Sequence, residues 1–350
     1  MTIWVGTRSN MSPLLTVFMP TFNGADFIED AIESVIASNT KDLEIVVVDD
    51  HSTDETVQRV EQIRHPAIRL FRQSTNLGVA ATRARSTPLF RGKYLALVDC
   101  DDITLPDRFD RQLERLEANA GPDIVGGYMR LFGDRSGMVC PPTSHELIRT
   151  VLQFFCPMNN PTVCMRMAPF RDGRLRYSAD ARVAEDYDLW VQAARHGLRF
   201  ENVDRVVIQY RCHAASTSRI LAEEASRRSD IVRRQVTELY FPRLSAQAKD
   251  ALAAAVSGDP WHDAKQAKTG IEALSHAAEL APLVPEIDPS VMVQMLEDAL
   301  LAHISKALHS KVVDNNILED ITENDDRFER WRARDEGALD RRIMDLVMSA

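Results

Sequence analysis

The sequence has few cysteines and no long apolar run, and both features restrict the classes of protein to which it can belong. Its five cysteines include no CxxC pair, which favours reduced thiols in a cytoplasm-like compartment and argues against a zinc site built from them. No stretch approaches the roughly 18 consecutive apolar residues that span a bilayer. Residues 1–20 also lack the basic and apolar regions of a secretory signal. We therefore expect a cytoplasmic protein, attached at most peripherally to the inner face of a membrane.

Basic residues and nucleotide-binding glycine motifs are also in short supply. The formal net charge is −10 and the pI is near 5.5, so the chain lacks the overall basic character typical of nucleic-acid binding, and we expect no nucleic-acid partner. Neither GxGxxG nor GxxxxGK occurs, which weakens the dinucleotide-binding and P-loop hypotheses. The "HEL" at residues 145–147 is not followed by the second histidine of a zincin.

The chain alternates short apolar runs with helix-like stretches between residue 14 and about residue 210. Such alternation predicts an α/β fold with a mostly parallel sheet. The predicted strands are residues 14–19, 43–48, 68–71 and 93–98, and the predicted helices are residues 26–38, 52–63 and 105–119. Ser52 and Glu55 have the spacing of a capping box at the start of the second helix.

The C-terminal part of the sequence has a different texture. After residue 220 the chain is rich in Ala, Glu, Arg and Leu and has no strand-like run of comparable strength, which predicts an all-helical region. We expect a flexible leader at residues 1–12, an α/β domain at 13–218 and a helical region at 219–350. The helices could pack among themselves, bind a partner, form a homo-oligomer or cover a substrate site, and the sequence leaves these options open.

Acidic and turn-forming residues follow three of the predicted strands. These segments are "PTFNG", "DDHSTDET" and "DCDD", which bring a turn motif and, in the pair "DD" and in "DCDD", five acidic residues to the carboxyl ends of the strands. In an open parallel sheet, ligands bind beyond those ends. We therefore place the functional site at this edge of the sheet.

The segment "DCDD" puts three carboxylates within four positions. Mutual repulsion would raise their pKa values unless a cation offsets the charge, and Mg²⁺ or Mn²⁺ with oxygen ligands is such a cation. Asp99 and Asp101, two residues apart, can face the same side of an extended turn, which makes them the candidate metal ligands. Asp102 is ambiguous, because it could cap the following helix or touch a bound substrate. The alternative is that all three merely solvate the turn and favour the helix start.

Several segments, taken in order, resemble one enzyme family. They are "LTVFMPTFNGADFIEDAIESVI", "IVVVDDHSTDETVQRV", "NLGVAATRAR", "KYLALVDCDDITLPDRFDRQ" and "AEDYDLWVQAARHG". Together they resemble the inverting glycosyltransferase family 2 over roughly residues 13 to 218. The resemblance implies the GT-A fold, a Rossmann-like α/β arrangement with flanking helices. It does not extend into the helical C-terminal region.

The resemblance implies a nucleotide-sugar donor, held first by its nucleoside. Pro20, Thr21 and Phe22 would flank the base, and Asp50 would accept a hydrogen bond from a uracil-type or related ring. Without the resemblance, Asp50 would be interpreted as part of a turn before a helix.

Two further residues are implied near the nucleotide. Asn76 would lie beside it, and Arg83 would neutralise charge on the diphosphate. The alternative for Arg83 is a surface arginine on an amphipathic helix. Many family members have Asn after this arginine, whereas this chain has Ala84, so any role of that Asn is missing or supplied elsewhere.

"DCD" matches the DxD motif of the family, in which a metal ion, Mn²⁺ or Mg²⁺, bridges the donor diphosphate to the protein. Asp99 and Asp101 would contact the metal, and Asp99 would also lie at the donor. The later segment "QYRCHAAST" makes His213 a further candidate metal or diphosphate ligand. The alternative for His213 is a partly exposed histidine without a ligand.

The acceptor hydroxyl needs a general base, because an alcohol is a poor nucleophile at neutral pH. The resemblance assigns this role to Asp186, with Glu185 as the second candidate and Asp188 as a residue that positions the acceptor or caps the helix. These acids would otherwise be interpreted as the first turn of a helix that runs to His196. One base acting in one displacement would invert the anomeric centre.

The sequence thus predicts a metal-dependent inverting glycosyltransferase that moves a sugar from a UDP-sugar or another nucleotide sugar to a hydroxyl. The acceptor would be a glycan, a lipid-linked saccharide or a protein. The chain has no QxxRW signature, so we expect one sugar to be added per encounter. One alternative is a catalytically silent nucleotide-sugar-binding or scaffold protein of the same fold. Another is a nucleotidyltransferase, which normally has a loop rich in glycine and basic residues after the first strand. The segment "MPTFNGADF" at this position has neither feature.

Overall fold

The computed structural model describes residues 2–4, 12–179, 183–213, 222–310 and 312. The chain divides into a sheet unit, Met1–Ser144 with Met158–Arg228, and a helical unit, His145–Pro157 with Ser229–Ala350. The predicted boundary between residues 218 and 219 falls outside the described residues. His145–Pro157 belongs to the helical unit, although the sequence pattern places it in the α/β domain.

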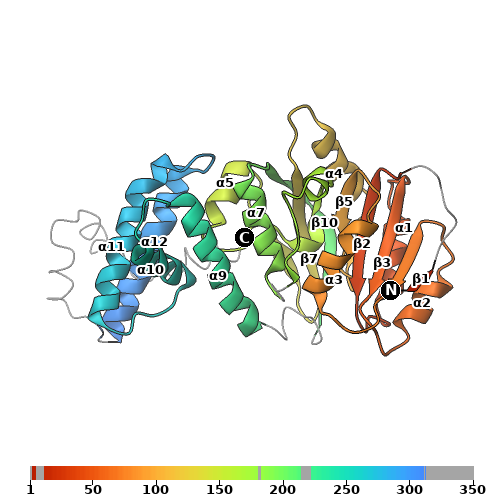
Figure 1. Cartoon of the computed structure of the whole chain (residues 1–350), viewed down its shortest axis with the longest axis horizontal. Helices are drawn as coiled ribbons and strands as arrows, with labels where there is room; N and C mark the ends of the chain where they lie inside the picture. The colour runs from red at the N-terminus through yellow and green to blue at the C-terminus, as the bar shows by residue number, and fades with distance from the viewer. Residues whose placement is uncertain (1, 5–11, 180–182, 214–221, 311, 313–350) are drawn as a thin grey trace. The chain divides into compact units, whose positions relative to one another are not determined.

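A ten-stranded sheet forms the framework of the sheet unit, in the order β1-β4-β3-β2-β5-β9-β7-β10-β6 with β8 paired to β7 (Figure 1). The strands are β1 (Thr2–Trp4), β2 (Leu15–Thr21), β3 (Leu43–Asp49), β4 (Ile68–Arg72), β5 (Tyr94–Leu97), β6 (Ile103–Thr104), β7 (Ile124–Gly133), β8 (Gly137–Val139), β9 (Cys164–Arg166) and β10 (Phe200–Cys212). The neighbours β4-β3-β2-β5 and the pair β7-β10 are parallel, and the other pairings are antiparallel. The four predicted strands are confirmed as β2 to β5.

One part of the predicted leader is a strand. Thr2–Trp4 form β1, which pairs antiparallel with β4, so this part of residues 1–12 is not a featureless leader. Residues 1 and 5–11 lie outside the described residues.

Helices connect the strands of the sheet unit. They are α1 (Ile28–Ile36), α2 (Thr56–Gln62), α3 (Val79–Ser86), η1 (Thr87–Leu89), α4 (Arg108–Glu117), η2 (Asn160–Thr162), α6 (Ala168–Arg171) and α7 (Glu185–Arg195). The three predicted helices are confirmed as α1, α2 and α4, with ends that differ by a few residues. The predicted helix that runs to His196 is confirmed as α7.

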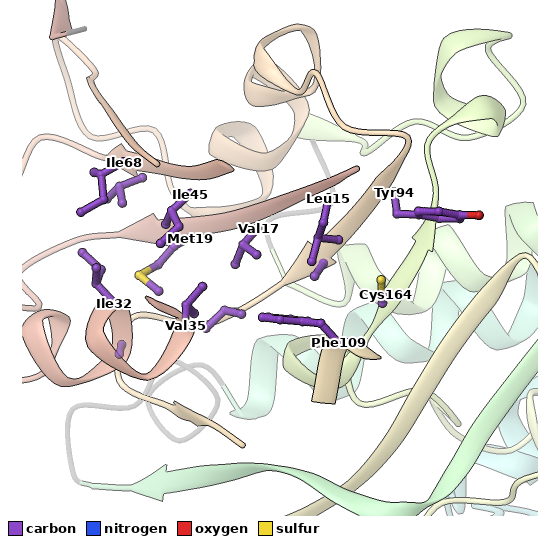
Figure 2. Close-up of a cluster of buried hydrophobic side chains, with 14 of the residues drawn as sticks. Leu15, Val17, Met19, Ile32, Val35, Ile45, Ile68, Tyr94, Phe109 and Cys164 are labelled. Carbon is purple, nitrogen blue, oxygen red and sulfur yellow. The ribbon is translucent and has the colours of Figure 1, made fainter. Parts of the chain in front are cut away.

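The core of the sheet unit lies between the parallel strands and the connecting helices. In β3 an uninterrupted apolar run is buried on both faces, as expected for a central parallel strand. The apolar positions of α1 recur at intervals of three and four residues and form one buried face. Figure 2 shows Ile32 and Val35 of this face lying against Val17 and Met19 of β2, in a cluster that extends to Phe109 of α4.

The helical unit contains one helix before residue 220 and the helices that the composition predicts after it. They are α5 (His145–Val151), α9 (Ala222–Tyr240), which begins before the unit does, α10 (Ala246–Ser257), α11 (Ala264–Leu280), η4 (Ala281–Leu283) and α12 (Pro289–His309). Ser245 and Asp263 cap α10 and α11 through their side-chain oxygens. No helix within the described ranges is long and apolar enough to cross a membrane.

Close packing at an aromatic pair joins three segments of the helical unit. The rings of Trp261 and His303 stack with centroids 4.8 Å apart. Gly270 of α11 leaves room for the indole, because a Cβ there would lie 2.5 Å from Trp261 Nε1. His303 Nε2 lies 2.7 Å from the carbonyl oxygen of Ala255. The segment before α11 is thereby fixed against α10 and α12.

Candidate active site

The turn after β2 is locked to the turn after β3. The main-chain N–H of Asn23 donates to Ser52 Oγ at 2.8 Å, and that of Gly24 donates to Thr56 Oγ1 at 2.8 Å. The predicted capping box is therefore wrong, because α2 begins at Thr56 and the Ser52 hydroxyl serves a distant turn. Glu55 occupies the N-cap position without a side-chain cap bond.

A close backbone approach brings the same first turn against the "DCDD" segment, residues 99–102, hereafter the DCDD turn. A Cβ on Gly24 would lie 2.9 Å from Thr21 Oγ1 and 3.0 Å from Cys100 Sγ, so a larger residue would push the turns apart. The predicted base-flanking residues lie here: Pro20 is partly buried, Thr21 is buried and Phe22 is 48% exposed. Phe22 thus offers an exposed aromatic face at this edge.

Asp50, the predicted base-contacting residue, organises the loop before α3. Its carboxylate accepts hydrogen bonds from Gln73 Nε2 at 2.8 Å, from the Leu77 N–H at 2.9 Å and from the Gly78 N–H at 2.7 Å. Burial raises the pKa of Asp50, and the two main-chain N–H groups oppose the shift. Asn76 is exposed in this loop. Asp50 therefore holds the "NLG" backbone, and its contact with a base stays a prediction.

The three carboxylates of the DCDD turn diverge. Asp102 is fully buried and accepts a hydrogen bond from the Arg211 N–H at 2.9 Å. Burial and the negative charges of Asp99 and Asp101 raise the pKa of Asp102 to about 9. Asp102 does not cap α4, because the N-cap position belongs to Asp107. Repulsion within the turn is thus relieved partly by keeping one of the three carboxyls protonated.

Asp101 turns toward β10, where it meets the predicted histidine. His213 Nε2 lies 2.9 Å from Asp101 Oδ2. Among the residues that the structure describes, no three His, Cys, Asp or Glu side chains gather as they would around a metal. A carboxylate beside an imidazole nevertheless fits Mn²⁺, with the remaining positions supplied by phosphate and water. Asp101 and His213 would hold such an ion, and Asp99 is the remaining candidate.

Arg83 connects the DCDD turn to α7. Its guanidinium is buried, lies 3.3 Å from Asp99 Oδ1 and forms an ion pair with Glu185. With the Asn160 side-chain amide turned so that its oxygen faces Arg83, that oxygen accepts from Nη2 at 2.7 Å and from Nη1 at 3.2 Å. The alternative of a surface arginine is wrong. The predicted role of Arg83 at the diphosphate stays a prediction, since three groups of the protein already surround it.

The two acids that begin α7 have different environments. Glu185 is buried against Arg83, whereas Asp186 is partly exposed and accepts from the Tyr187 N–H at 2.7 Å. Burial and the negative charge of Glu185 raise the pKa of Asp186 to about 6, although Arg83 opposes the shift. Asp188 accepts from Gln192 within the same helix. Asp186 is therefore largely ionised at neutral pH, as a general base requires.

Three residues of this region were not found by sequence reasoning. Asn160 contacts Arg83, Arg211 contacts the DCDD turn, and the buried Arg108 donates to the carbonyl oxygen of Leu97 at 2.8 Å. No local pattern marks Asn160 or Arg108. Arg211 carries a weak signal, because it lies two positions before His213 and alternate residues of a strand share a face.

Comparison with known proteins shows similarity to one family over part of the chain. Residues 16–175 match the family described as "Glycosyl transferase family 2". A Haemophilus influenzae protein named "Uncharacterized glycosyltransferase" is 27% identical over 250 residues, covering 68% of this chain and 77% of the relative. An Escherichia coli relative, "UDP-Glc:alpha-D-GlcNAc-diphosphoundecaprenol beta-1,3-glucosyltransferase", is 24% identical over 225 residues, covering 63% of this chain and 86% of the relative.

Solved structures show the same fold at lower identity. Residues 1–349 of S. aureus TarS, in complex with UDP-GlcNAc, align with a TM-score of 0.57 and 18% identity, covering 88% of this chain and 91% of that one. A mannosyltransferase from Pyrobaculum calidifontis, in complex with GDP-Man and Mn²⁺, aligns with a TM-score of 0.50 and 18% identity, covering 89% and 91%. The GT-A fold predicted from the sequence is thus confirmed.

Proposed function

We propose that the chain is a member of glycosyltransferase family 2, whose family model matches residues 16–175, and that it transfers a sugar from a nucleotide-sugar donor to a hydroxyl acceptor with inversion, using a divalent cation. One observation carries the proposal. Arg83 contacts both Asp99 of the DCDD turn and Glu185, the residue before Asp186. The donor motif and the candidate base therefore belong to one connected site, which a merely nucleotide-binding protein would not need.

The donor side of the proposal rests on the turns after β2, β3 and β5. Pro20, Thr21 and Phe22 would receive the base, with Asp50 and Asn76 beside it. The E. coli relative is named for a UDP-Glc donor, and the TarS structure contains UDP-GlcNAc, so a UDP-sugar is the first donor to test. When bound by Asp101, His213 and Asp99, Mn²⁺ or Mg²⁺ supplies charge neutralisation for the leaving diphosphate.

The acceptor side rests on the first turn of α7. Asp186 takes the proton of the acceptor hydroxyl as the oxygen attacks the anomeric carbon. Glu185 is held by Arg83, so it raises the proton affinity of Asp186 and keeps the base itself free. A single displacement without a covalent intermediate inverts the anomeric centre.

The remaining expectations concern the setting of the reaction. We propose a glycan, lipid-linked saccharide or protein acceptor, one sugar per encounter, and a cytoplasmic location that includes the inner face of the membrane when the acceptor is lipid-linked. The E. coli relative is named for a diphosphoundecaprenol-linked acceptor, which makes a lipid-linked saccharide the first acceptor to test. A homo-oligomer formed through the helical region stays a prediction.

A donor screen tests this function. Purified full-length protein is incubated with UDP- and GDP-sugars, with Mn²⁺ or with EDTA, and donor hydrolysis, nucleotide release and thermal shift are measured. We expect Mn²⁺-dependent stabilisation by one donor class, and a product whose anomeric configuration, read by NMR, is opposite to that of the donor. Transfer with retention would contradict the single-displacement mechanism. Donor binding without hydrolysis or transfer to any acceptor would favour the catalytically silent alternative.

A further inference from the structure

Arg211, at the end of β10, holds the main chain of the DCDD turn. Its main-chain N–H donates to Asp102 Oδ1 at 2.9 Å, and its side-chain Nε donates to the carbonyl oxygen of Asp101 at 2.9 Å. A longer contact of 3.5 Å joins its Nη2 to the exposed carboxylate of Asp30. One residue of β10 therefore fixes two consecutive residues of the turn that carries the donor-side carboxylates.

Two aromatic rings hold this guanidinium in place. The Arg211 Cζ atom lies 4.8 Å from the centroid of Phe27 and 4.6 Å from that of Phe132. Phe132 is the neighbour of Arg211 in the parallel ladder between β7 and β10. A planar guanidinium can lie against rings while its edge donates hydrogen bonds, and an ammonium cannot reproduce that geometry. The position of the side chain is thus set by the sheet.

The same cluster includes the histidine that meets Asp101. The rings of Phe27 and His213 have centroids 4.8 Å apart, and His213 follows Arg211 by two residues. The chain after the turn continues into β6, which pairs with β10 at Ile103 and Thr104. The DCDD turn and the end of β10 therefore form a single assembly in which the Asp101 carboxylate faces His213.

We propose that Arg211 is a positioning residue for the donor side of the site, which keeps the DCDD turn fixed to β10 so that Asp101 and His213 stay paired. This inference rests on the proposed function, because it assumes that the pair faces the diphosphate and its cation. Arg211 acts through the turn, and its contacts with the protein account for the role without direct contact with substrate.

The test compares Arg211→Lys with Arg205→Lys, a matched control on the same strand whose side chain is 61% exposed. The first measurement needs no ligand: amide hydrogen exchange of a peptide covering residues 98–105 in the free protein. We expect faster exchange in Arg211→Lys, unchanged exchange in β3, and no change in Arg205→Lys. Phe132→Leu, which removes one ring and keeps the arginine, should shift exchange in the same direction and by less. Unchanged exchange of this peptide in both Arg211→Lys and Phe132→Leu would overturn the proposal.

The second measurement is a titration of Mn²⁺ binding in the presence of UDP, in which electron paramagnetic resonance reports the concentration of free Mn²⁺. Residues that orient metal ligands typically contribute about 10–100-fold to metal affinity, so we expect Arg211→Lys to weaken Mn²⁺ binding by about 10-fold or more. Once His213→Ala is present, the additional loss from Arg211→Lys should be much smaller. Equal affinity in the variant and the wild type would overturn this inference alone. No Mn²⁺ binding by the wild type would overturn the proposed metal dependence with it.

Discussion

The sheet unit and the helical unit both bury ionisable side chains, but these side chains have different partners in the two units. Within the described residues, the sheet unit buries a large set of charged groups, namely Glu44, Asp49, Asp50, Arg83, Asp102, Arg108 and Glu185. The helical unit buries His145, Arg149, Asp298 and His303, and the rest of its core consists mainly of alanine, leucine and other apolar residues. Removing one partner from a buried ion pair typically costs about 3–5 kcal/mol, so a domain keeps such groups only with partners in place.

The location of the partners shows what this difference means. In the sheet unit, Asp50 directly follows β3 and Asp102 directly precedes β6. Arg83 joins Asp99, in the same turn as Asp102, to Glu185 of α7. In the helical unit, His303 contacts a carbonyl oxygen and a ring. Most of the buried carboxylates of the sheet unit therefore lie where the chemistry is expected, although Glu44 lies at the other end of β3. In the helical unit, the buried Arg149 pairs with Glu286 of the same unit. Four substitutions test this contrast.

The largest effect is expected from Asp186→Asn, which removes the proposed base and leaves the shape of the site. General bases typically contribute about 10²–10⁴-fold to rate, so transfer should fall by that factor while the donor Kd stays nearly constant. In the wild type, activity should rise as pH increases through about 6, where Asp186 is half ionised, and level off at higher pH. Steady-state kinetics and donor titration measure both. Asp172→Asn, at an exposed acid, is the control, and loss of donor binding in Asp186→Asn would refute the base assignment.

A smaller but still large effect is expected from Arg83→Met. The substitution leaves Glu185 buried without its cation and Asp99 without its ion-pair partner, which should lower the free energy of unfolding of the sheet unit by about 3–5 kcal/mol. Denaturant unfolding measures the loss. Combining it with Glu185→Gln should recover part of the stability, because the unpaired charge is gone. If the double variant is no more stable than Arg83→Met, the ion pair is not what Arg83 stabilises.

The third substitution, Gly270→Ala, probes the apolar packing of the helical unit. Alanine favours a helix, but its Cβ would lie 2.5 Å from Trp261 Nε1. We expect the steric clash to prevail and to destabilise the helical unit by about 1–3 kcal/mol. Hydrogen exchange of peptides from α11 and α12 reports on that unit. Gly258→Ala, where φ is +81° and no atom lies near the added Cβ, separates backbone strain from crowding.

The smallest effect concerns pH and His303. Burial lowers the pKa of His303 from its ordinary value of 6.5, so the unfolded chain binds a proton more readily than the folded one. His303 therefore costs no stability at a pH above 6.5. As the pH falls below 6.5, the unfolded chain takes up the proton first, and the helical unit should lose stability. The loss should be smaller than that of Gly270→Ala. In His303→Gln the slope of stability against pH over this range should diminish, and an unchanged slope would assign it to other groups.

Sequence reasoning located β2 to β5, the helices α1, α2, α4 and α7, the C-terminal helices and the acidic motifs, because each is encoded by neighbouring residues. It did not locate the other strands of the sheet. Asp101 and His213 were both proposed as metal ligands, and they are in contact. Sequence reasoning failed where a side chain binds a segment that is distant in the sequence. The spacing of Ser52 and Glu55 suggests a helix cap, but the Ser52 hydroxyl accepts from Asn23 instead. Asn160 could not be found, because its importance arises only when folding brings it to Arg83.

The interlocked turns also affect how such a domain can be altered. Side chains of the second turn hold the backbone of the first through Ser52 and Thr56, and Gly24 sets the spacing between the first turn and Cys100 of the third. A donor-specificity graft that exchanged one turn alone would leave hydroxyls and N–H groups of the others without partners. The three turns should therefore be transplanted between related enzymes as one set, whereas the exposed ring of Phe22 can be varied on its own.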